Sequence, residues 1–219
     1  MLVNLAYGRT GLPVEFPDDR TTVIEPTYLD GLPDQHGAVR GALEHPNGTA
    51  PLRELVNAGQ TVAISVCDIT RPMPSATVLP LVLDALAHVP TDQIAILIAS
   101  GTHRATTHDE LVEMLGAAVV DRCRIVVHDA FDDTQLTSLG EVEGRIPVWL
   151  NRTWVEADIR VTTGFVEPHF FAGFSGGPKM VAPGLAGFET IMRLHDAEMI
   201  RHPNARWGVT EGNPIHDGV

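Results

Sequence analysis

Residues 62–72 read Val-Ala-Ile-Ser-Val-Cys-Asp-Ile-Thr-Arg-Pro, a nearly continuous apolar run that passes directly into a polar one. Further apolar runs follow at residues 94–99, 125–127 and 159–163. Unbroken apolar runs of this length are typical of parallel strands that are covered on both faces. We therefore expect four buried parallel strands, with the polar run at the carboxyl end of the first.

Helical patterns separate these runs. Between the first two, apolar residues recur at helical spacing, at Leu79, Val82, Leu83 and Leu86. Between the second and third, Thr107 and Glu110 form a capping box ahead of another amphipathic segment. Strands that alternate with helices at this interval predict an α/β fold with a Rossmann-like doubly wound parallel sheet.

The N-terminal part of the chain has a different pattern. Residues 2–7 and the alternating residues 12–16 flank a turn at residues 8–11, which predicts an N-terminal β-hairpin with one solvated face. Residues 18–47 are rich in Pro, Gly and Asp. We expect them to form a surface connection around a short helix at residues 38–44.

The composition bounds the class of protein. The 219 residues carry 15 Lys and Arg against 28 Asp and Glu, a formal net charge of -13. This balance disfavours nucleic-acid binding, which requires clustered cations. No apolar run approaches the ~20 residues that a membrane span needs, the N-terminus lacks the basic start of a signal peptide, and only two cysteines are present. We expect a cytoplasmic protein that contacts neither nucleic acid nor membrane.

Three of the predicted strands are followed by unusual polar runs. These runs are Cys67-Asp-Ile-Thr-Arg-Pro72, Ser100-Gly-Thr-His-Arg104, and Glu167-Pro-His169 with the glycine-rich loop Phe171-Ala-Gly-Phe-Ser-Gly-Gly-Pro-Lys179. Because the carboxyl ends of parallel strands meet at one edge of the sheet, the three runs can line one pocket. The sequence therefore predicts a ligand site at that edge.

The polar runs carry groups of complementary chemistry, namely Asp68, Arg71, His103, His169 and Lys179. They supply an anion clamp, two bases that titrate near neutral pH and a nucleophilic amine. Each also has a structural interpretation, because Asp68 and Arg71 can form a salt bridge and His103 can be an exposed loop residue. The glycine-rich loop is similar to a phosphate-binding nest, but its spacing is not that of a Walker A motif.

His195 lies in a predicted helix that runs from Gly187 to His202, on the apolar stripe of that helix. Two interpretations stay open for it. It can be a core histidine bonded to a carbonyl, or a ligand of Zn, Ni or Cu. The chain has no HExxH or CxxC motif, so a metal here needs ligands that the chain does not provide.

These motifs together resemble the N-terminal domain of the nickel-pincer-dependent lactate racemase family. The resemblance extends over essentially the whole chain and is carried by residues 68–72, 100–104 and 167–179, with His195 on the segment that follows. It implies that residues 1–219 are an N-terminal cofactor-anchoring α/β domain. The family's C-terminal domain is expected after the point where this chain stops, and would be a partner of this domain.

The resemblance also implies a cofactor, the nickel-pincer nucleotide, which is a Ni(II) pyridinium-3,5-bisthiocarboxylate mononucleotide. His195 matches the family's nickel ligand, and Lys179 matches the lysine that is joined covalently to one arm of the cofactor. A square-planar Ni(II) that is held by the cofactor needs only one imidazole. The other expected cofactor contacts are Asp68, Ile69, Thr70, Arg71, Ser175, Gly176 and Gly177.

The implied activity is that of an isomerase, a racemase or epimerase that inverts C2 of a small, lactate-like 2-hydroxy acid by hydride transfer to the cofactor. His103 and His169 are the expected acid/base pair, because imidazole suits proton transfer near neutral pH. Arg71 is expected to hold the substrate carboxylate. We expect the isolated domain to be inactive or weak, because its cleft would lack one wall.

Two alternatives stay open. The chain can be a non-catalytic domain that binds a nucleotide-like cofactor. It can also be a lysine-dependent, aldolase-type enzyme in which Lys179 forms a Schiff base.

Overall fold

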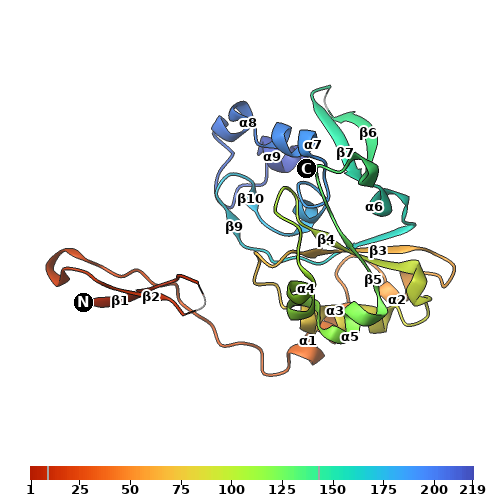
Figure 1. The fold of residues 1–219 in the computed structure, drawn as a ribbon, viewed down its shortest axis with the longest axis horizontal. Coiled ribbons are helices and arrows are strands. Elements are labelled where there is room, and N and C mark those ends of the chain that lie inside the picture. Colours follow the sequence, from red (N-terminus) through yellow and green to blue (C-terminus); the bar gives the residue numbers. More distant parts are fainter. Residues whose placement is uncertain (9, 143) are drawn as a thin grey trace. The chain divides into compact units, whose positions relative to one another are not determined.

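The computed structural model describes residues 1–8, 10–142 and 144–219 (Figure 1). These residues form two compact units, Met1–Pro33 and Asp34–Val219. None of the helices in the described part of the chain has the length and apolar character that crossing a bilayer requires.

The first unit contains the predicted N-terminal hairpin. Strands β1 (Leu2–Leu5) and β2 (Leu12–Glu15) pair antiparallel over their full length. The N-terminal ammonium of Met1 donates to the Phe16 carbonyl over 2.7 Å, just beyond the paired strands. The turn expected at residues 8–11 includes residue 9, which lies outside the described residues.

The second unit is built on a parallel four-stranded sheet with the order β5-β4-β3-β8 (Figure 1). Its strands are β3 (Val62–Cys67), β4 (Ile94–Ala99), β5 (Arg124–Val127) and β8 (Ile159–Thr162). The predicted α/β fold with a parallel sheet is confirmed. The outer strands β5 and β8 are only partly buried, so the expectation of burial on both faces holds for β3 and β4 alone.

Helices cover one face of the sheet, as the periodicity predicts. These are α3 (Ser75–Ala85), α4 (His108–Leu115) and α5 (Ala117–Arg122), and their apolar residues pack on the Val and Ile side chains of β3 and β4. In Figure 1 the three helices lie together on one side of the sheet. The predicted capping box of Thr107 and Glu110 is present at the start of α4.

The opposite face carries elements that the sequence did not predict. Strands β6 (Leu136–Val142) and β7 (Ile146–Asn151) form an antiparallel pair, and the short helix α6 (Arg152–Glu156) follows. β6 is exposed over most of its length, so its apolar pattern is too weak to identify from sequence. With α7 these elements enclose a second core on the side of the sheet opposite α3–α5 (Figure 1).

The predicted helix from Gly187 to His202 is wrong, because two short helices replace it. They are α7 (Phe188–Leu194) and α8 (Ala197–Arg201). Asp196 causes the break, since its side chain accepts a hydrogen bond from the Met199 N–H and caps the start of α8. His195 therefore lies at the C-terminal end of α7 and not on a stripe inside a continuous helix.

Apart from α1, the remaining elements are short. They are η1 (Asp18–Arg20), α1 (Gln35–Glu44), α2 (Leu52–Leu55), η2 (Thr91–Gln93), η3 (Asp133–Gln135), β9 (Pro168–His169), β10 (Gly173–Phe174), η4 (Gly177–Met180) and α9 (Pro214–Gly218). The helix expected at residues 38–44 is α1, which begins earlier because Asp34 caps it by accepting from the Gly37 N–H. β9 directly precedes the glycine-rich loop, which contains β10 and most of η4.

Candidate functional site

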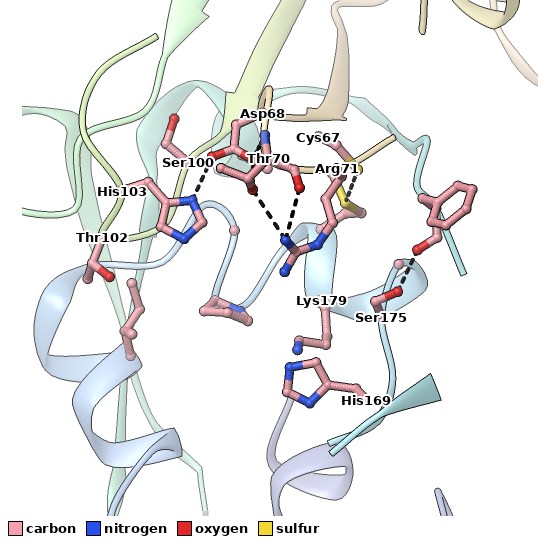
Figure 2. Close-up of a pocket in the computed structure, with 18 of the residues that line it drawn as sticks. Cys67, Asp68, Thr70, Arg71, Ser100, Thr102, His103, His169, Ser175 and Lys179 are labelled. Atoms are coloured by element: carbon pink, nitrogen blue, oxygen red, sulfur yellow. Dashed lines mark hydrogen bonds and ion pairs between the residues drawn. The ribbon is translucent and has the colours of Figure 1, made fainter. Parts of the chain in front are cut away.

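A cavity of about 370 Å³ opens at the carboxyl edge of the sheet (Figure 2). It is lined by the segments that follow β3 and β4, by the glycine-rich loop and by α7. The predicted site residues in its lining are Asp68, Thr70, Arg71, His103, His169, Ser175, Gly176, Lys179 and His195. Two other predicted residues are not part of the lining: Ile69 is half-buried in the turn after β3, and Gly177 is exposed.

The turn after β3 is organised by the buried carboxylate of Asp68. Its Oδ1 accepts from the backbone N–H and the hydroxyl of Thr70, at 3.2 and 2.6 Å. Its Oδ2 lies 2.6 Å from Nδ1 of His103, in the segment after β4. The salt bridge considered between Asp68 and Arg71 is therefore replaced by a hydrogen bond between Asp68 and His103.

Arg71 projects into the cavity from the same turn (Figure 2). Its Nη1 donates to the carbonyl oxygen and the hydroxyl of Thr70, at 3.4 and 3.2 Å. Asp68 is the only acid among the described residues that line the cavity, while Arg71 and Lys179 bring positive charge to it. Although the chain carries a net charge of -13, this cavity is therefore suited to an anionic ligand.

His103 is placed by a tight turn at the end of β4. Gly101 takes a φ of 54°, and the His103 N–H donates to the Ser100 carbonyl over 2.9 Å. This turn directs the half-exposed imidazole of His103 toward Asp68. The two residues are 35 positions apart in the chain, and adjacent parallel strands bring them together.

His169 lies in β9, where it pairs with Gly173 of β10. Its Nδ1 accepts hydrogen bonds from the backbone N–H groups of Phe171 and Ala172, at 3.4 and 3.2 Å. The ring also stacks on Phe170, with the centroids 4.7 Å apart. Burial, together with the positive charges of Lys179 and Arg71, lowers the pKa of His169 to about 4.

Lys179 lies in η4, beside His169 in Figure 2. Burial, and then the positive charge of Arg71, lowers the pKa of its amine to about 8. Its Nζ lies 5.9 Å from the centroid of the Phe171 ring. An amine with this pKa is neutral in a substantial fraction of molecules near pH 7–8, which makes it a stronger nucleophile than an ordinary lysine.

The glycine-rich loop is closed by Ser175. The Ser175 hydroxyl donates to the Phe165 carbonyl over 2.6 Å, and its backbone N–H donates to the Glu167 carbonyl over 2.9 Å. Gly176 has a φ of 68°, and a Cβ there would lie 3.0 Å from the Phe165 carbonyl oxygen. The Ser175 N–H is therefore already engaged, and only Gly176 and Gly177 stay as proposed backbone donors to a phosphate.

His195 faces the same cavity from the end of α7. Its Nδ1 lies 2.7 Å from the Ile191 carbonyl oxygen. A carbonyl only accepts, so Nδ1 carries the proton and the neutral ring keeps a lone pair at Nε2. This arrangement is typical of metal-binding histidines, but the described residues contain no group of three or more His, Cys, Asp or Glu that could hold a metal ion by themselves.

One residue that supports the site was missed at the sequence level. Ser65 is buried in the middle of β3, and its hydroxyl donates to the Met180 carbonyl over 2.7 Å. This bond joins the segment that carries Lys179 to β3, one of the two inner strands of the sheet. A polar residue inside an apolar run was the signal in the sequence that could have identified it.

Comparison with known proteins gives consistent results. A sequence profile described as the lactate racemase N-terminal domain matches residues 7–208. Over 219 residues, the chain is 38% identical to lactate racemase of Thermoanaerobacterium thermosaccharolyticum and 36% identical to that of Lactiplantibacillus plantarum. Each match covers 98% of this chain and 51% of the relative, so the chain spans about half the length of the curated relatives it matches.

Solved structures agree with this result. The lactate racemase apoprotein from Thermoanaerobacterium thermosaccharolyticum matches with a TM-score of 0.84 and 38% identity, over 100% of this chain and 52% of that one. A Thermotoga maritima protein matches with a TM-score of 0.67 and 26% identity, over 87% of this chain and 47% of that one. Since the profile covers most of the sequence, the chain belongs to the lactate racemase N-terminal domain family.

Proposed function

We propose that this chain is the cofactor-anchoring part of an isomerase that inverts C2 of a small 2-hydroxy acid. The observation that carries the proposal is the cavity that gathers His103, His169, Arg71 and Lys179 at one edge of the sheet. Two imidazoles beside an arginine supply the proton-handling groups and the carboxylate clamp that such a reaction needs. The names of the two relatives support the same reaction class.

Arg71 is the residue that we assign to the substrate carboxylate. Its bonds to Thr70 use only Nη1, so the guanidinium has further N–H donors for a bidentate contact. A carboxylate held there lies in the cavity that His103 and His169 also line. We assign the hydroxyl proton of the substrate to these two imidazoles.

The residues present fit the cofactor that the family resemblance implies. His195 offers a lone pair at Nε2, because its Nδ1–H is fixed on the Ile191 carbonyl. Lys179 is the only lysine in the chain, and its lowered pKa favours a covalent bond through its amine. We therefore assign His195 to nickel and Lys179 to the covalent tether. A bound nickel-pincer nucleotide would supply a hydride acceptor to the cavity.

The other residues proposed to contact the cofactor differ in whether they can reach it directly. Thr70 and Arg71 line the cavity beside Lys179, and Gly176 and Gly177 offer backbone N–H groups at the start of η4. Asp68 has both oxygens engaged by Thr70 and His103, so we propose that it acts mainly by positioning His103. Ile69 is proposed to act only through the shape of its turn.

Mass spectrometry and metal analysis test the proposal. The chain is expressed together with the enzymes that make the cofactor. We expect the mass of the cofactor to be added at Lys179, with about one nickel per chain. Lys179→Arg keeps the charge but lacks the amine and is expected to carry no adduct. His195→Ala is expected to keep the adduct and lose nickel. An unmodified Lys179 in the unsubstituted chain, without nickel, contradicts the proposal.

The second candidate is a non-catalytic domain that binds the cofactor. It is favoured by the half-exposed side chain of His103, since a proton-transfer site normally excludes water. Racemisation of a 2-hydroxy acid by the cofactor-loaded chain would rule it out. Adduct formation without any turnover, even when the remaining half of a relative is supplied, would favour it.

A Schiff-base enzyme is the third candidate, and the lowered pKa of Lys179 favours it. Borohydride reduction in the presence of a small keto acid separates this candidate from the others. A trapped adduct at Lys179 supports it. The absence of an adduct, under conditions where a general amine reagent still labels Lys179, excludes it.

A further inference from the structure

We infer that the N-terminal unit, Met1–Pro33, is a docking element whose apolar face binds the polypeptide that forms the remaining half of the lactate racemase relatives. We call this unit the N-terminal arm. The inference rests on family membership and not on the isomerase chemistry proposed above. It is carried by a hairpin that has an apolar face but no core to bury it in.

The N-terminal arm exposes an unusual share of the apolar side chains. None of its described residues is buried. The arm makes up only 33 of the 219 residues, yet it holds about half of the large apolar side chains that are exposed in the described chain. Apolar side chains that gather on the surface of a folded protein usually belong to an interface. The arm is therefore the first place to look for a binding surface outside the cavity.

The hairpin of the arm has one wholly apolar face. Val3 lies opposite Val14 in the paired strands, and Leu5 lies opposite Leu12. Side chains two positions apart lie on the same face of a strand, so both pairs share one face. Leu5 and Leu12 are 43% and 45% exposed. We call these four residues the apolar face of the arm.

The other face of the hairpin and the outer edge of β2 are less suited to binding. Asn4 lies opposite Pro13 on this face, and Glu15 adds a charge. Met1 and Phe16 exchange both backbone hydrogen bonds, at 2.7 and 2.9 Å, and such pairs alternate with pairs that exchange none. By this alternation the nitrogen of Pro13 lies on the outer edge of β2, where it offers no N–H to a further strand. The apolar face is therefore the side on which a partner can dock.

The arm has no core of its own. A two-stranded hairpin alone is marginally stable in water. Residues 21–32, which follow the hairpin, contain no helix or strand and expose Ile24, Tyr28 and Leu29 by 91%, 82% and 90%. Each of the two cores of the second unit consists only of residues from that unit. A partner that covers the apolar face would therefore stabilise the arm as well as bind it.

The comparisons favour one occupant for this face. The family profile begins at residue 7, so part of the arm belongs to the sequence pattern of the family. The matches to the two lactate racemases cover 98% of this chain and only 51% of each relative. In the relatives, an arm of this kind therefore occurs together with a further half that has no counterpart in residues 1–219. A second copy of this chain is a poorer occupant, because each copy carries a net charge of -13.

Hydrogen exchange followed by mass spectrometry tests the inference. In the chain alone, we expect the amides of β1 and β2 to exchange at least about 100-fold faster than those of β3 and β4. This difference should be the same at low and at high protein concentration. Slow exchange in the arm at every concentration would mean that the second unit already covers it. Protection that rises with concentration would mean that a second copy does. Either result overturns the inference.

The full-length lactate racemase of Thermoanaerobacterium thermosaccharolyticum provides the second measurement. In its segment that matches residues 2–15, we expect the amides to exchange at least about tenfold more slowly than those of β1 and β2 in the chain alone. Because this relative is a natural protein, the result does not depend on the folding of a hybrid. Equally fast exchange in the two proteins overturns the inference.

Two variants of a hybrid identify the face. The hybrid continues this chain after Val219 with the remaining half of that relative. Leu5→Asn places an amide on the apolar face, and Leu2→Asn makes the same change on the other face of β1, where Leu2 is 73% exposed. We expect Leu5→Asn to return the arm to fast exchange and Leu2→Asn to keep it protected. Equal effects of the two substitutions overturn the assignment of the face, and if the hybrid does not fold, the full-length relative decides. These measurements use neither cofactor nor substrate, so the proposed function can fail while the docking stands, and the reverse.

Discussion

The two faces of the central sheet are built from different side chains. In β3, Ile64 and Val66 point toward α3–α5, whereas Ala63 and Ser65 point toward the loop that carries Lys179. Large β-branched residues bury more apolar area and so contribute more to stability. Small residues let another backbone lie close to the sheet. The difference teaches that the candidate site is built on the face where β3 carries its smaller side chains, although that face also has a core of its own.

On the face to which Ala63 and Ser65 point, which we call the small-residue face, two glycines show how closely the backbone of the loop approaches the sheet. A Cβ at Gly184 would lie 2.8 Å from the Cβ of Ala99, and a Cβ at Gly164 would lie 3.0 Å from the Cα of Gly176. Neither separation leaves room for a side chain. Backbone therefore packs on backbone where the glycine-rich loop meets the sheet, and this contact holds η4 at the sheet edge.

The largest effect on stability should come from the face to which Ile64 and Val66 point, which we call the large-residue face. Leu79 of α3 is fully buried among the strands' Val and Ile side chains, so Leu79→Ala is expected to lower the free energy of unfolding by about 2–5 kcal/mol. Leu83, on the same helix but only partly buried, is the matched control and should lose less on truncation. Urea unfolding followed by circular dichroism measures both variants.

The same pair tests the separation of the two faces. If stability and site are separate, the folded fraction of Leu79→Ala should keep the lowered pKa of Lys179 and the hydrogen bond between Asp68 and His103. A change in these site properties at a urea concentration well below the unfolding transition would show that the faces are coupled.

The sequence predicted the large-residue face well, because its signals are local. The runs at residues 62–67 and 94–99, the spacing in α3 and the Thr107 cap each depend on neighbours within one element. The meeting of the polar runs at one cavity also followed, because parallel strands end at a common edge.

The partners within the site could not be predicted in the same way. The bond between Asp68 and His103 spans 35 residues, and that between Ser65 and Met180 spans 115. The first depends on which strands are neighbours and on their register, and the second on how η4 packs on the sheet. Hydrophobic pattern alone gives neither. The break at Asp196 was missed because the apolar spacing of the two short helices is similar to that of one longer helix.

The second-largest effect should come from the contact between the small-residue face and the site. Ser65→Ala removes the buried hydroxyl that donates to the Met180 carbonyl, and leaving that carbonyl without this donor is expected to cost about 1–3 kcal/mol. Hydrogen exchange should also become faster in η4. Ser100→Ala is the matched control, since that buried hydroxyl donates over 3.3 Å to the carbonyl of Ile98, only two residues earlier in the chain. Equal losses in the two variants would contradict a special role for Ser65.

A smaller effect is expected at the cap of α4. Thr107→Ala removes the side chain that accepts from the Glu110 N–H, which should lower the free energy of unfolding by about 0.5–2 kcal/mol. Because α4 belongs to the large-residue face, Lys179 should keep its pKa. Thr49→Ala, at an exposed position, should leave stability within experimental error. Thermal unfolding, with NMR titration of Lys179, measures both properties.

The smallest effect concerns the charge of Lys179, which titrates on the site face. Burial is the main cause of its lowered pKa and Arg71 the second, so Arg71→Gln should return that pKa only part of the way from about 8 toward 10.5. The ¹³C signal of labelled lysine follows this titration without assignment, because the chain has a single lysine. An unchanged pKa would mean that Arg71 lies too far from the amine to affect it.

The lowered pKa of Lys179 also makes the free energy of unfolding depend on pH. Between pH 8 and 10.5 the unfolded chain binds a proton at Lys179 that the folded chain does not, so this group makes the free energy of unfolding rise with pH across that window. Lys179→Gln should flatten the rise, and Arg71→Gln should shift its start to higher pH. If the free energy of unfolding has the same slope against pH in the unsubstituted chain and in both variants, the pKa of Lys179 is the same in the folded and the unfolded chain. The small-residue face would then not hold a lysine activated as a nucleophile.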